Sequence, residues 1–307
     1  MFRMQTIGRR LLLLPAFRSA PSLQTRSLAA FPQLANVEIE EAAKGVAHVK
    51  LNRPKARNAF TPDLWDDLHV AFDHLHADSA CRAVVLSGNG ASFCAGIDLK
   101  MGLAKLMETV QSEEKDVGRK AFKIKELIKK YQASYTSLES CQKPVITAIH
   151  SHCFGAATSL VTAADVRYAS KDATFSIKEV DVGLAADVGV LQRIPKIVGN
   201  DSWVREVTYT ARIFSADEAL QQGFVSRLFD TREECVRAAV ELAVEIAAKS
   251  PIAVQGSKLA LNHARNNSID ASLDWIASHN AVQLQSDDLV RIAKAMLEKK
   301  TPEFDDL

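Results

Sequence analysis

The stretch that decides the fold is KPVITAIHSHCFGAATSLVTAADVRYAS, residues 143–170. It opens with the apolar run PVITAIH, which predicts a buried strand, and Gly155 then precedes a run of small residues that favours a closely packed helix. VRYAS and the nearby TFSI follow as short strands. A strand, a helix and a further strand in this order favour an α/β core with a parallel sheet.

The alternation of strands and helices extends outward in both directions. Residues 36–41 and 46–51 alternate apolar and polar side chains on either side of Gly45, which predicts a β-hairpin. Further elements are predicted toward the centre of the chain: a helix that begins at Thr61-Pro62, a buried strand over 83–88 and a helix over 117–138. After about residue 188 the pattern is mostly helical, over 200–211, 215–222, 231–249, 252–265 and 268–299.

The start of the chain differs in composition from the rest. Residues 1–32 contain several Ser and Thr, no acidic residue and five arginines, at positions 3, 9, 10, 18 and 26. Such a start is typical of a mitochondrial transit peptide, and a disordered basic tail is the alternative. We predict a transit peptide over 1–32 and a location in the mitochondrial matrix. The C-terminal DDL is not the peroxisomal S-K-L signal.

The overall composition excludes several classes of protein. Without the five N-terminal arginines the chain has 33 basic and 37 acidic residues, so its net charge of −4 gives no footprint for nucleic acid. No stretch approaches the roughly 20 apolar residues of a membrane-spanning helix. The five cysteines are odd in number and form no C-x-x-C motif, which indicates reduced thiols in an intracellular compartment.

Two junctions between a strand and a helix indicate a functional site. FCAGIDL (93–99) follows the strand AVVLSG, and HCFGAAT (152–158) follows PVITAIH. The first N–H groups of a helix have no partner within the helix, and small side chains let a ligand approach them closely. Two such N–H groups that converge on one point form an oxyanion hole. Each junction alone is ordinary α/β architecture, so the pair carries the inference.

Other catalytic patterns are missing from the sequence. There is no G-x-G-x-x-G, no G-x-x-x-x-G-K-[ST] and no G-x-S-x-G. His150 and His152 could share one face of a strand end, as two metal ligands do. Since no third ligand stands near them in the sequence, we predict packing or capping roles for both histidines and no metal site.

IKEVDVGLAAD, residues 177–187, is a mostly apolar stretch that carries three acids, Glu179, Asp181 and Asp187. A solvated loop is the simple interpretation. Together with three other stretches it resembles the successive motifs of the crotonase, or enoyl-CoA hydratase/isomerase, superfamily, and most closely the dienoyl-CoA isomerase branch. The other stretches are LNRPKARNAF, FCAGIDL and KPVITAIHSHCFGAATSLVTAADVRYAS.

The resemblance implies an α/β fold, the crotonase (ClpP-like) spiral of β-β-α units with a helical C-terminal region. It implies a core over 33–235 and a helical region over 236–307 that closes the acyl-CoA site and supports oligomerisation. The family assembles as homotrimers or homohexamers. No cofactor is implied, because CoA is part of the acyl-CoA thioester substrate.

The resemblance also implies residue roles. The N–H groups of Ile97 and Ala156 hold the thioester oxygen, and Glu179 and Asp187 are the acid and base. The acyl-CoA site is lined by Ala95, Gly96, Ile97, Asp98 and Leu99. Ser159 departs from the family, which carries a carboxylate there. The family's Gly-Gly-Gly run is replaced by Gly155-Ala156-Ala157, so two methyl groups are expected to crowd the oxyanion hole.

These roles predict isomerisation of 3,5-dienoyl-CoA to 2,4-dienoyl-CoA in β-oxidation, with Glu179 acting at carbon 2 and Asp187 at carbon 6. An apolar wall raises a carboxyl pKa, and we expect that wall from residues 180, 182 and 184–186. Asp181 is expected to pair with an arginine such as Arg193. The alternatives are hydration of enoyl-CoA or another crotonase activity, and a catalytically degenerate acyl-CoA-binding protein, which the departure at Ser159 allows.

Overall fold

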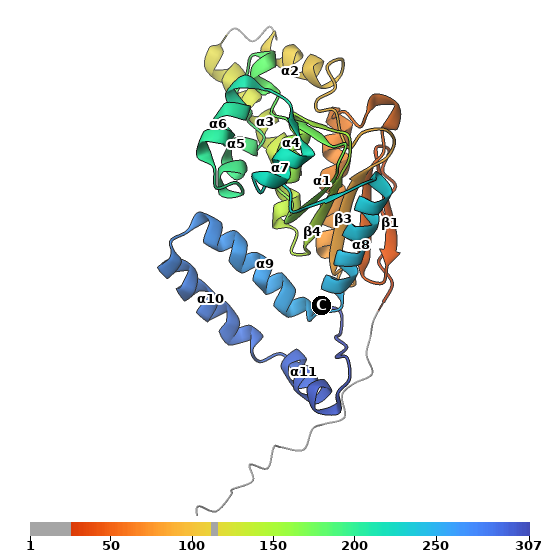
Figure 1. The fold of residues 1–307 in the computed structure, drawn as a ribbon. Coiled ribbons are helices and arrows are strands. Elements are labelled where there is room, and N and C mark those ends of the chain that lie inside the picture. The colour runs from red at the N-terminus through yellow and green to blue at the C-terminus, as the bar shows by residue number, and fades with distance from the viewer. Residues whose placement is uncertain (1–25, 112–115) are drawn as a thin grey trace, which may run out of the picture.

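The strands form two sheets in the computed structural model, which describes residues 26–111 and 116–307 (Figure 1). The larger sheet has the order β1-β2-β3-β4-β6-β9, and the smaller has the order β5-β7-β8. Only β1 is antiparallel to its neighbour in the larger sheet. The strands are β1 (Val37–Ala43), β2 (Val46–Leu51), β3 (Ala83–Gly88), β4 (Val145–Ile149), β5 (His152–Phe154), β6 (Val166–Ser170), β7 (Thr174–Ser176), β8 (Phe214–Ser215) and β9 (Arg227–Phe229).

Helices cover both faces of the larger sheet, as its continuous apolar strands require. Along β3, Val84 and Leu86 belong to the core cluster that contains the buried side chains of α1 and α3, whereas Val85 belongs to the cluster that contains Ala239 and Ala243 of α8. The helices are α1 (Pro62–Ala77), α2 (Gly102–Val110), α3 (Val117–Ser140), α4 (Ala156–Thr162), α5 (Val190–Arg193), α6 (Asp201–Thr210), α7 (Ala216–Gln221), α8 (Arg232–Ala247), α9 (Pro251–Asn266), α10 (Ile269–Gln283) and α11 (Asp287–Glu298).

Most of the predicted elements are confirmed with small changes at their ends. The hairpin forms around Gly45, and α1 begins at Pro62 with the Thr61 hydroxyl accepting a hydrogen bond from the Leu64 N–H. The helix predicted over 268–299 is instead two helices. The first ends at Gln283, and Ser286 caps the start of α11 by accepting a hydrogen bond from the Asp288 N–H. The predicted boundary between residues 235 and 236 falls inside α8, which packs on the sheet.

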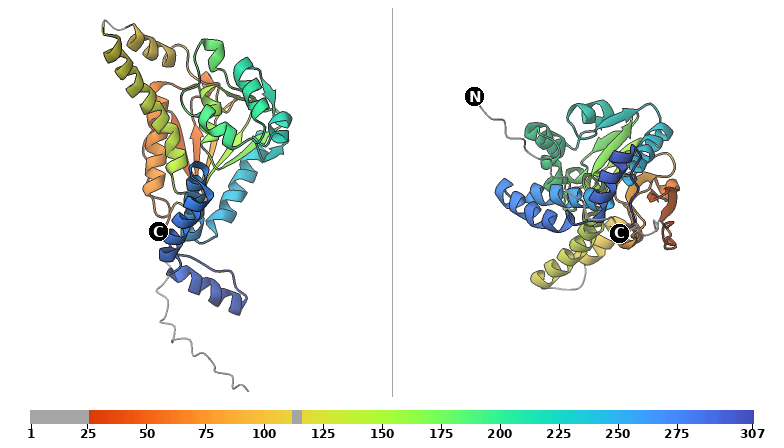
Figure 2. Two further views of the ribbon diagram at one scale, coloured as in Figure 1. Left: turned by 90° about the vertical axis from the view of Figure 1, so that its left-hand side faces the viewer. Right: turned by 90° about the horizontal axis from the view of Figure 1, so that it is seen from below.

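The last helices extend away from the sheets. Helices α9 and α10 run side by side in opposite directions, and α11 lies beyond them (Figures 1 and 2). The chain then returns to the core at its C-terminal end. Residues 1–25 of the predicted transit peptide lie outside the described residues, while Leu28 and Phe31 pack against the core.

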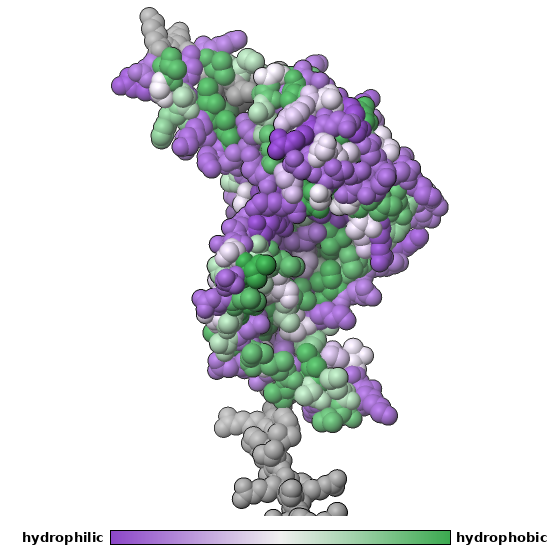
Figure 3. Space-filling model, turned by 60° about the vertical axis from the view of Figure 1, so that its left-hand side comes forward, coloured by the Kyte–Doolittle hydropathy of each residue, from purple (hydrophilic) through white to green (hydrophobic). Residues whose placement is uncertain are grey.

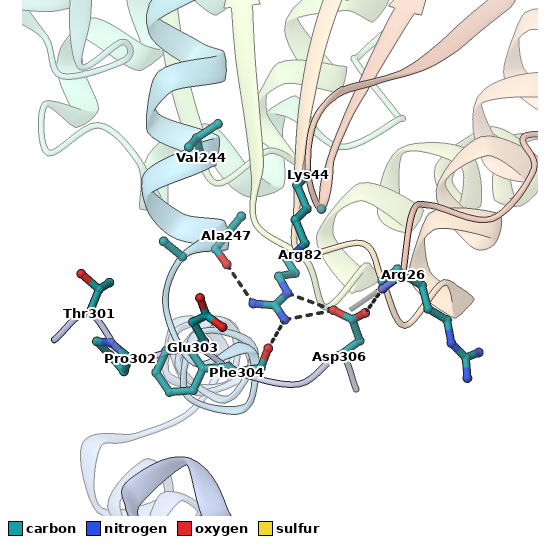
Figure 4. Close-up of a pocket in the computed structure, with 13 residues that line it drawn as sticks. Arg26, Lys44, Arg82, Val244, Ala247, Thr301, Pro302, Glu303, Phe304 and Asp306 are labelled. Atoms are coloured by element: carbon teal, nitrogen blue, oxygen red, sulfur yellow. Dashed lines mark hydrogen bonds and ion pairs between the residues drawn. The ribbon is translucent and has the colours of Figure 1, made fainter. Parts of the chain in front are cut away.

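Arg82 holds the returning C-terminal segment (Figure 4). Its guanidinium donates hydrogen bonds to the carbonyl oxygens of Ala247 (3.1 Å) and Phe304 (2.7 Å) and to Asp306 Oδ1 (3.0 Å). The other oxygen of Asp306 accepts a hydrogen bond from the Arg26 N–H at 2.9 Å. One side chain therefore joins α8, the C-terminal segment and, through Asp306, the first described residue.

Replacing Arg82 with Met is expected to lower the free energy of unfolding by about 3 kcal/mol, since it leaves a buried carboxylate and two carbonyl groups without their donor. Both side chains of this ion pair are largely buried, at 12% and 10% exposure. Denaturant unfolding measures the change. Arg237→Met is the control, because its pair with Glu241 is exposed and 3.9 Å long. Equal stability of the two variants would contradict the prediction.

Candidate active site

The two junctions between strands and helices lie side by side. The Cys94 N–H donates to the His152 carbonyl at 2.9 Å, and the Phe154 N–H donates to the Cys94 carbonyl at 3.2 Å. Gly96 has a φ of +99°, and a Cβ there would lie 2.8 Å from the Phe154 carbonyl oxygen and 3.9 Å from the Ala156 nitrogen. Glycine is thus required at this position for the two turns to approach each other.

The N–H groups predicted for the oxyanion hole are available at this meeting point. Ala156 is the first residue of α4, so its N–H has no partner within the helix. Among the backbone hydrogen bonds found in residues 26–111 and 116–307, neither the Ile97 nor the Ala156 N–H is a donor. Both residues line the same cavity. Two donors beside one cavity are what an oxyanion requires.

This cavity has a volume of about 370 Å³ and a mostly apolar lining. Its walls come from α1, the start of α2, α3, both junctions and the loop that follows β7. The acids Glu179 and Asp187 face it together. The remaining lining residues are Trp65, Ala95, Gly96, Ile97, Leu99, Gly102, Leu127, Ile128, Tyr131, Phe154, Gly155, Ala156, Lys178, Asp181, Val182, Leu184 and Val188.

Glu179 lies at the start of a 3₁₀ turn, Glu179–Val182, next to the second junction. Its Oε1 is 3.9 Å from the point that a Cβ on Gly155 would occupy. Its Oε2 is buried and has no hydrogen-bond partner among the residues that the structure describes. Burial and, to a lesser extent, the charge of Asp187 raise the pKa of this carboxyl. A desolvated carboxyl with an elevated pKa suits proton transfer near neutral pH.

Asp187 reaches the cavity from the loop between Val182 and α5. Burial also raises the pKa of this carboxyl. Its main-chain oxygen accepts a hydrogen bond from Gln132 Nε2 at 2.6 Å. The two acids thus face one mostly apolar cavity, and the charge of Asp187 contributes to the raised pKa of Glu179.

The predicted partner of Asp181 is wrong. Asp181 pairs with Lys178 at 3.0 Å, while Arg193 pairs with Glu139 at 2.8 Å. The 3₁₀ turn explains the difference, because it brings side chains three residues apart onto one side. Lys178 then also donates to the Ala211 carbonyl at 3.0 Å. Asp181 therefore belongs to the exposed edge of the cavity.

The predicted apolar wall is also largely wrong. Val180 and Val182 are 39% and 52% exposed, and among the five predicted residues only Val182 and Leu184 line the cavity. Side chains of α1 and α3 contribute much of the apolar lining instead. Trp65 and Tyr131 stack with ring centroids 4.7 Å apart and line the cavity with Leu127 and Ile128. These residues are distant in sequence from the acids and were not among the predicted site residues.

The other predicted site residues divide into two groups. Ala95, Gly96, Ile97, Leu99 and Ala156 line the cavity, with Leu99 exposed at its mouth. Asp98 does not line it: its carboxylate pairs with Arg53 at 3.3 Å and accepts hydrogen bonds from the N–H groups of Lys100 and Met101. Asp98 therefore shapes the turn that leads into α2.

Position 159 and Ala157 are buried behind the cavity lining. Ser159 is completely buried, and its hydroxyl has no hydrogen-bond partner within the described part of the chain. Ala157 packs into the hydrophobic core, so only the methyl group of Ala156 borders the cavity. The expected crowding of the oxyanion hole by two methyl groups is reduced to one.

The two histidines have ordinary partners. His150 Nε2 lies 3.0 Å from the Gly90 carbonyl oxygen, and His152 Nδ1 lies 3.0 Å from Ser92 Oγ. Within residues 26–111 and 116–307, no three His, Cys, Asp or Glu side chains gather in a way that could hold a metal ion. In the same ranges, none of the helices has the length and apolar character needed to cross a membrane.

The chain belongs to the enoyl-CoA hydratase/isomerase family, whose sequence pattern matches residues 41–307. The crystal structure of an enoyl-CoA hydratase from Bacillus anthracis has a TM-score of 0.78 to this fold at 26% identity, covering 88% of this chain and 99% of that one. The predicted crotonase fold is confirmed.

Two relatives are more similar in sequence. The chain is 48% identical to the mitochondrial Delta(3,5)-Delta(2,4)-dienoyl-CoA isomerase of Rattus norvegicus over 265 residues, 86% of this chain and 80% of that protein. It is 40% identical to the peroxisomal Delta(3,5)-Delta(2,4)-dienoyl-CoA isomerase of Arabidopsis thaliana over 259 residues, 84% of this chain and 92% of that protein.

Proposed function

We propose that the protein isomerises 3,5-dienoyl-CoA to 2,4-dienoyl-CoA in the β-oxidation of unsaturated fatty acids. The observation that carries this proposal is the pair of acids with raised pKa, Glu179 and Asp187, in one apolar cavity with the open N–H groups of Ile97 and Ala156. The relatives named as dienoyl-CoA isomerases support it.

In the proposed reaction, Glu179 removes a proton from carbon 2 of the acyl chain. The electron pair moves along the conjugated system, and negative charge builds on the thioester oxygen of the resulting dienolate. Asp187, in its protonated form, delivers a proton to carbon 6, and the double bonds settle at positions 2 and 4. Two acids suit two proton-transfer points that lie several ångströms apart.

The N–H groups of Ile97 and Ala156 would bind the thioester oxygen of the dienolate. Such donors act where the charge develops, and the loss of one typically costs roughly 3–4 kcal/mol in the transition state. The reaction neither oxidises nor reduces the substrate overall, and CoA is its handle. We therefore propose no cofactor for the chemistry.

A direct assay tests the proposal. The purified protein is given 3,5-dienoyl-CoA, and the ultraviolet absorbance of the conjugated product is followed, with crotonyl-CoA in a parallel reaction. We expect isomerisation and little hydration, because position 159 lacks the second carboxylate of the hydratases. Hydration of crotonyl-CoA at a comparable rate would favour the hydratase alternative. Binding of the CoA ester without turnover would favour a degenerate acyl-CoA-binding protein.

Replacing Ser159 with Ala is expected to change kcat by less than about twofold and to leave the melting temperature unchanged or slightly higher. The hydroxyl has no partner in the described structure. Its removal therefore breaks no hydrogen bond and eliminates the cost of burying an unsatisfied polar group. Thermal unfolding and steady-state kinetics check both points. A tenfold loss of kcat at unchanged stability would place Ser159 in the reaction.

We also propose import into the mitochondrial matrix through the predicted transit peptide, residues 1–32. The rat relative is named as mitochondrial and the plant relative as peroxisomal, so the relatives differ in compartment. Residues 1–36 fused to a fluorescent protein are expected to direct it to mitochondria. Fluorescence spread through the cytosol would contradict this.

For assembly, we propose a homotrimer or homohexamer built through α9–α11. Large apolar side chains gather on these helices (Figure 3), although they are exposed in the single chain: Leu261, Ile269, Leu273, Val282, Leu284, Met296 and Leu297. Exposed apolar surface of this extent typically marks an interface. Analytical ultracentrifugation should give the mass of three or six chains, and a stable monomer would refute the proposal.

A further inference from the structure

A polar stripe on α3 faces the loop that carries Asp187. Gln132, Thr136 and Glu139 are spaced four and three residues apart, so they share one face of the helix. Gln132 Nε2 donates to the Asp187 main-chain oxygen at 2.6 Å. Thr136 Oγ1 and Glu139 Oε2 accept hydrogen bonds from Arg193 at 3.2 and 2.8 Å. The stripe therefore holds the chain at Asp187 and again at Arg193, the last residue of α5.

Gly189 lets the chain pass closely over the Arg193 guanidinium. It has a φ of +127°, and a Cβ there would lie 1.9 Å from Arg193 Nη1. The main-chain N–H of Arg193 donates a hydrogen bond to the Gly189 carbonyl at 3.1 Å. Because Gly189 is two residues after Asp187, the position of the guanidinium sets the path of the loop directly behind the acid.

A second stripe, on α9, completes the arrangement. Lys258, Asn262 and Arg265 have the same spacing of four and three residues. Lys258 Nζ donates to the Leu138 carbonyl at 3.1 Å, and Asn262 Nδ2 donates to the Glu139 carbonyl at 3.0 Å. Arg265 Nη1 donates to Glu139 Oε1 at 3.1 Å. Helix α9 thus satisfies carbonyl groups at the C-terminal end of α3, and Glu139 binds one arginine on each carboxylate oxygen.

The loop forms a thin partition between two cavities. Asp187 faces the apolar cavity of the proposed active site, whereas Gln132, Glu139 and Arg193 line a polar cavity of about 630 Å³. Val188 borders both cavities. Asp187 lies outside any helix or strand, so contacts from behind the partition fix its position.

We propose that Gln132, Glu139 and Arg193 are positioning residues for Asp187, and that Arg265 makes α9 part of the same network. This inference rests on the proposed isomerase function. A proton-transfer group must be held within about half an ångström of its productive position, and a misplacement of 1 Å can cost about a hundredfold in rate. The network reaches Asp187 through its main chain and leaves its carboxyl group free to react.

The first test is Gln132→Met, which keeps the length of the side chain and removes its donor. We expect kcat for dienoyl-CoA isomerisation to fall about tenfold or more, with KM within twofold and the melting temperature nearly unchanged. Gln192→Met is the matched control: Gln192 lines the same polar cavity, is exposed and makes no hydrogen bond to Asp187 in the described structure. Its kcat should equal that of the wild type.

The second test separates positioning from general stability. In the Asp187→Asn background, Gln132→Met should lower kcat no further, because both changes act through the same carboxyl group. A purely structural role would instead multiply the two losses. Arg265→Met should lower the kcat of the wild type severalfold and should likewise cause no further loss of kcat in the Asp187→Asn background. Multiplied losses in either double variant would overturn the network.

The outcomes keep this inference apart from the proposed function. If the wild type isomerises and Gln132→Met matches Gln192→Met, the positioning role is refuted and the isomerase function stands. If the wild type does not isomerise dienoyl-CoA, the proposed function fails and the inference fails with it.

Discussion

Replacing Glu179 with Gln is expected to lower kcat about a thousandfold, within the range of effects for a positioned general base. The amide keeps the shape of the side chain beside Gly155 but cannot accept the proton from carbon 2. In heavy water, the wild type should exchange the carbon-2 hydrogen of the substrate, and this variant should not. Mass spectrometry of recovered substrate measures the exchange, and kcat comes from the absorbance assay.

The stability of the Glu179→Gln variant and the pH dependence of the wild-type enzyme serve as controls for this prediction. Burial and the neighbouring Asp187 raise the pKa of Glu179 above its unfolded value, so the folded state holds more protons and this group lowers stability as pH rises through that region. The Gln variant should therefore be as stable as the wild type at neutral pH, or more stable. In the wild type, kcat/KM should rise with pH as the base ionises. Near-normal kcat in the variant would contradict the assigned role.

Replacing Asp187 with Asn is expected to lower kcat about a hundredfold, through loss of proton delivery to carbon 6. Carbon-2 exchange in heavy water should persist, because Glu179 and the two N–H donors remain. The two variants thus fail at different steps, although both acids line one cavity.

The opposite pattern would exchange the two roles. If Asp187→Asn abolished carbon-2 exchange and Glu179→Gln preserved it, Asp187 would be the base at carbon 2. If both variants kept exchange and turnover, the pair would not carry the reaction. In the wild type, kcat/KM should also fall at higher pH, where Asp187 loses the proton that it delivers. This fall should be absent from the Asp187→Asn variant alone.

The fold could be predicted from the sequence wherever local patterns determine the element. The hairpin around Gly45, the start of α1 at Thr61 and the buried strand β4 follow from alternation, capping and apolar runs. The two junctions could also be placed, because small residues follow a strand in each. The two junctions meet through a main-chain β-bridge between Cys94 and Cys153, and local sequence does not encode this contact.

The surroundings of the acids could not be predicted in this way. Trp65 and Tyr131, which line the cavity together with the acids, come from α1 and α3, far from Glu179 in sequence. Arg193 pairs with Glu139 although Asp181 is closer in sequence, because the 3₁₀ turn places Asp181 beside Lys178. Periodicity identifies which face of a helix is apolar, but tertiary packing decides which residues that face meets.

The contacts of Arg82 have a consequence for the connectivity of the chain. Asp306 binds Arg82 and also the Arg26 N–H, so the beginning and the end of the described fold lie within a few bonds of each other. A short peptide linker could therefore join residue 307 to residue 26 without displacing either segment. Such a circularised chain should keep the native arrangement of sheets and helices and gain resistance to exopeptidases.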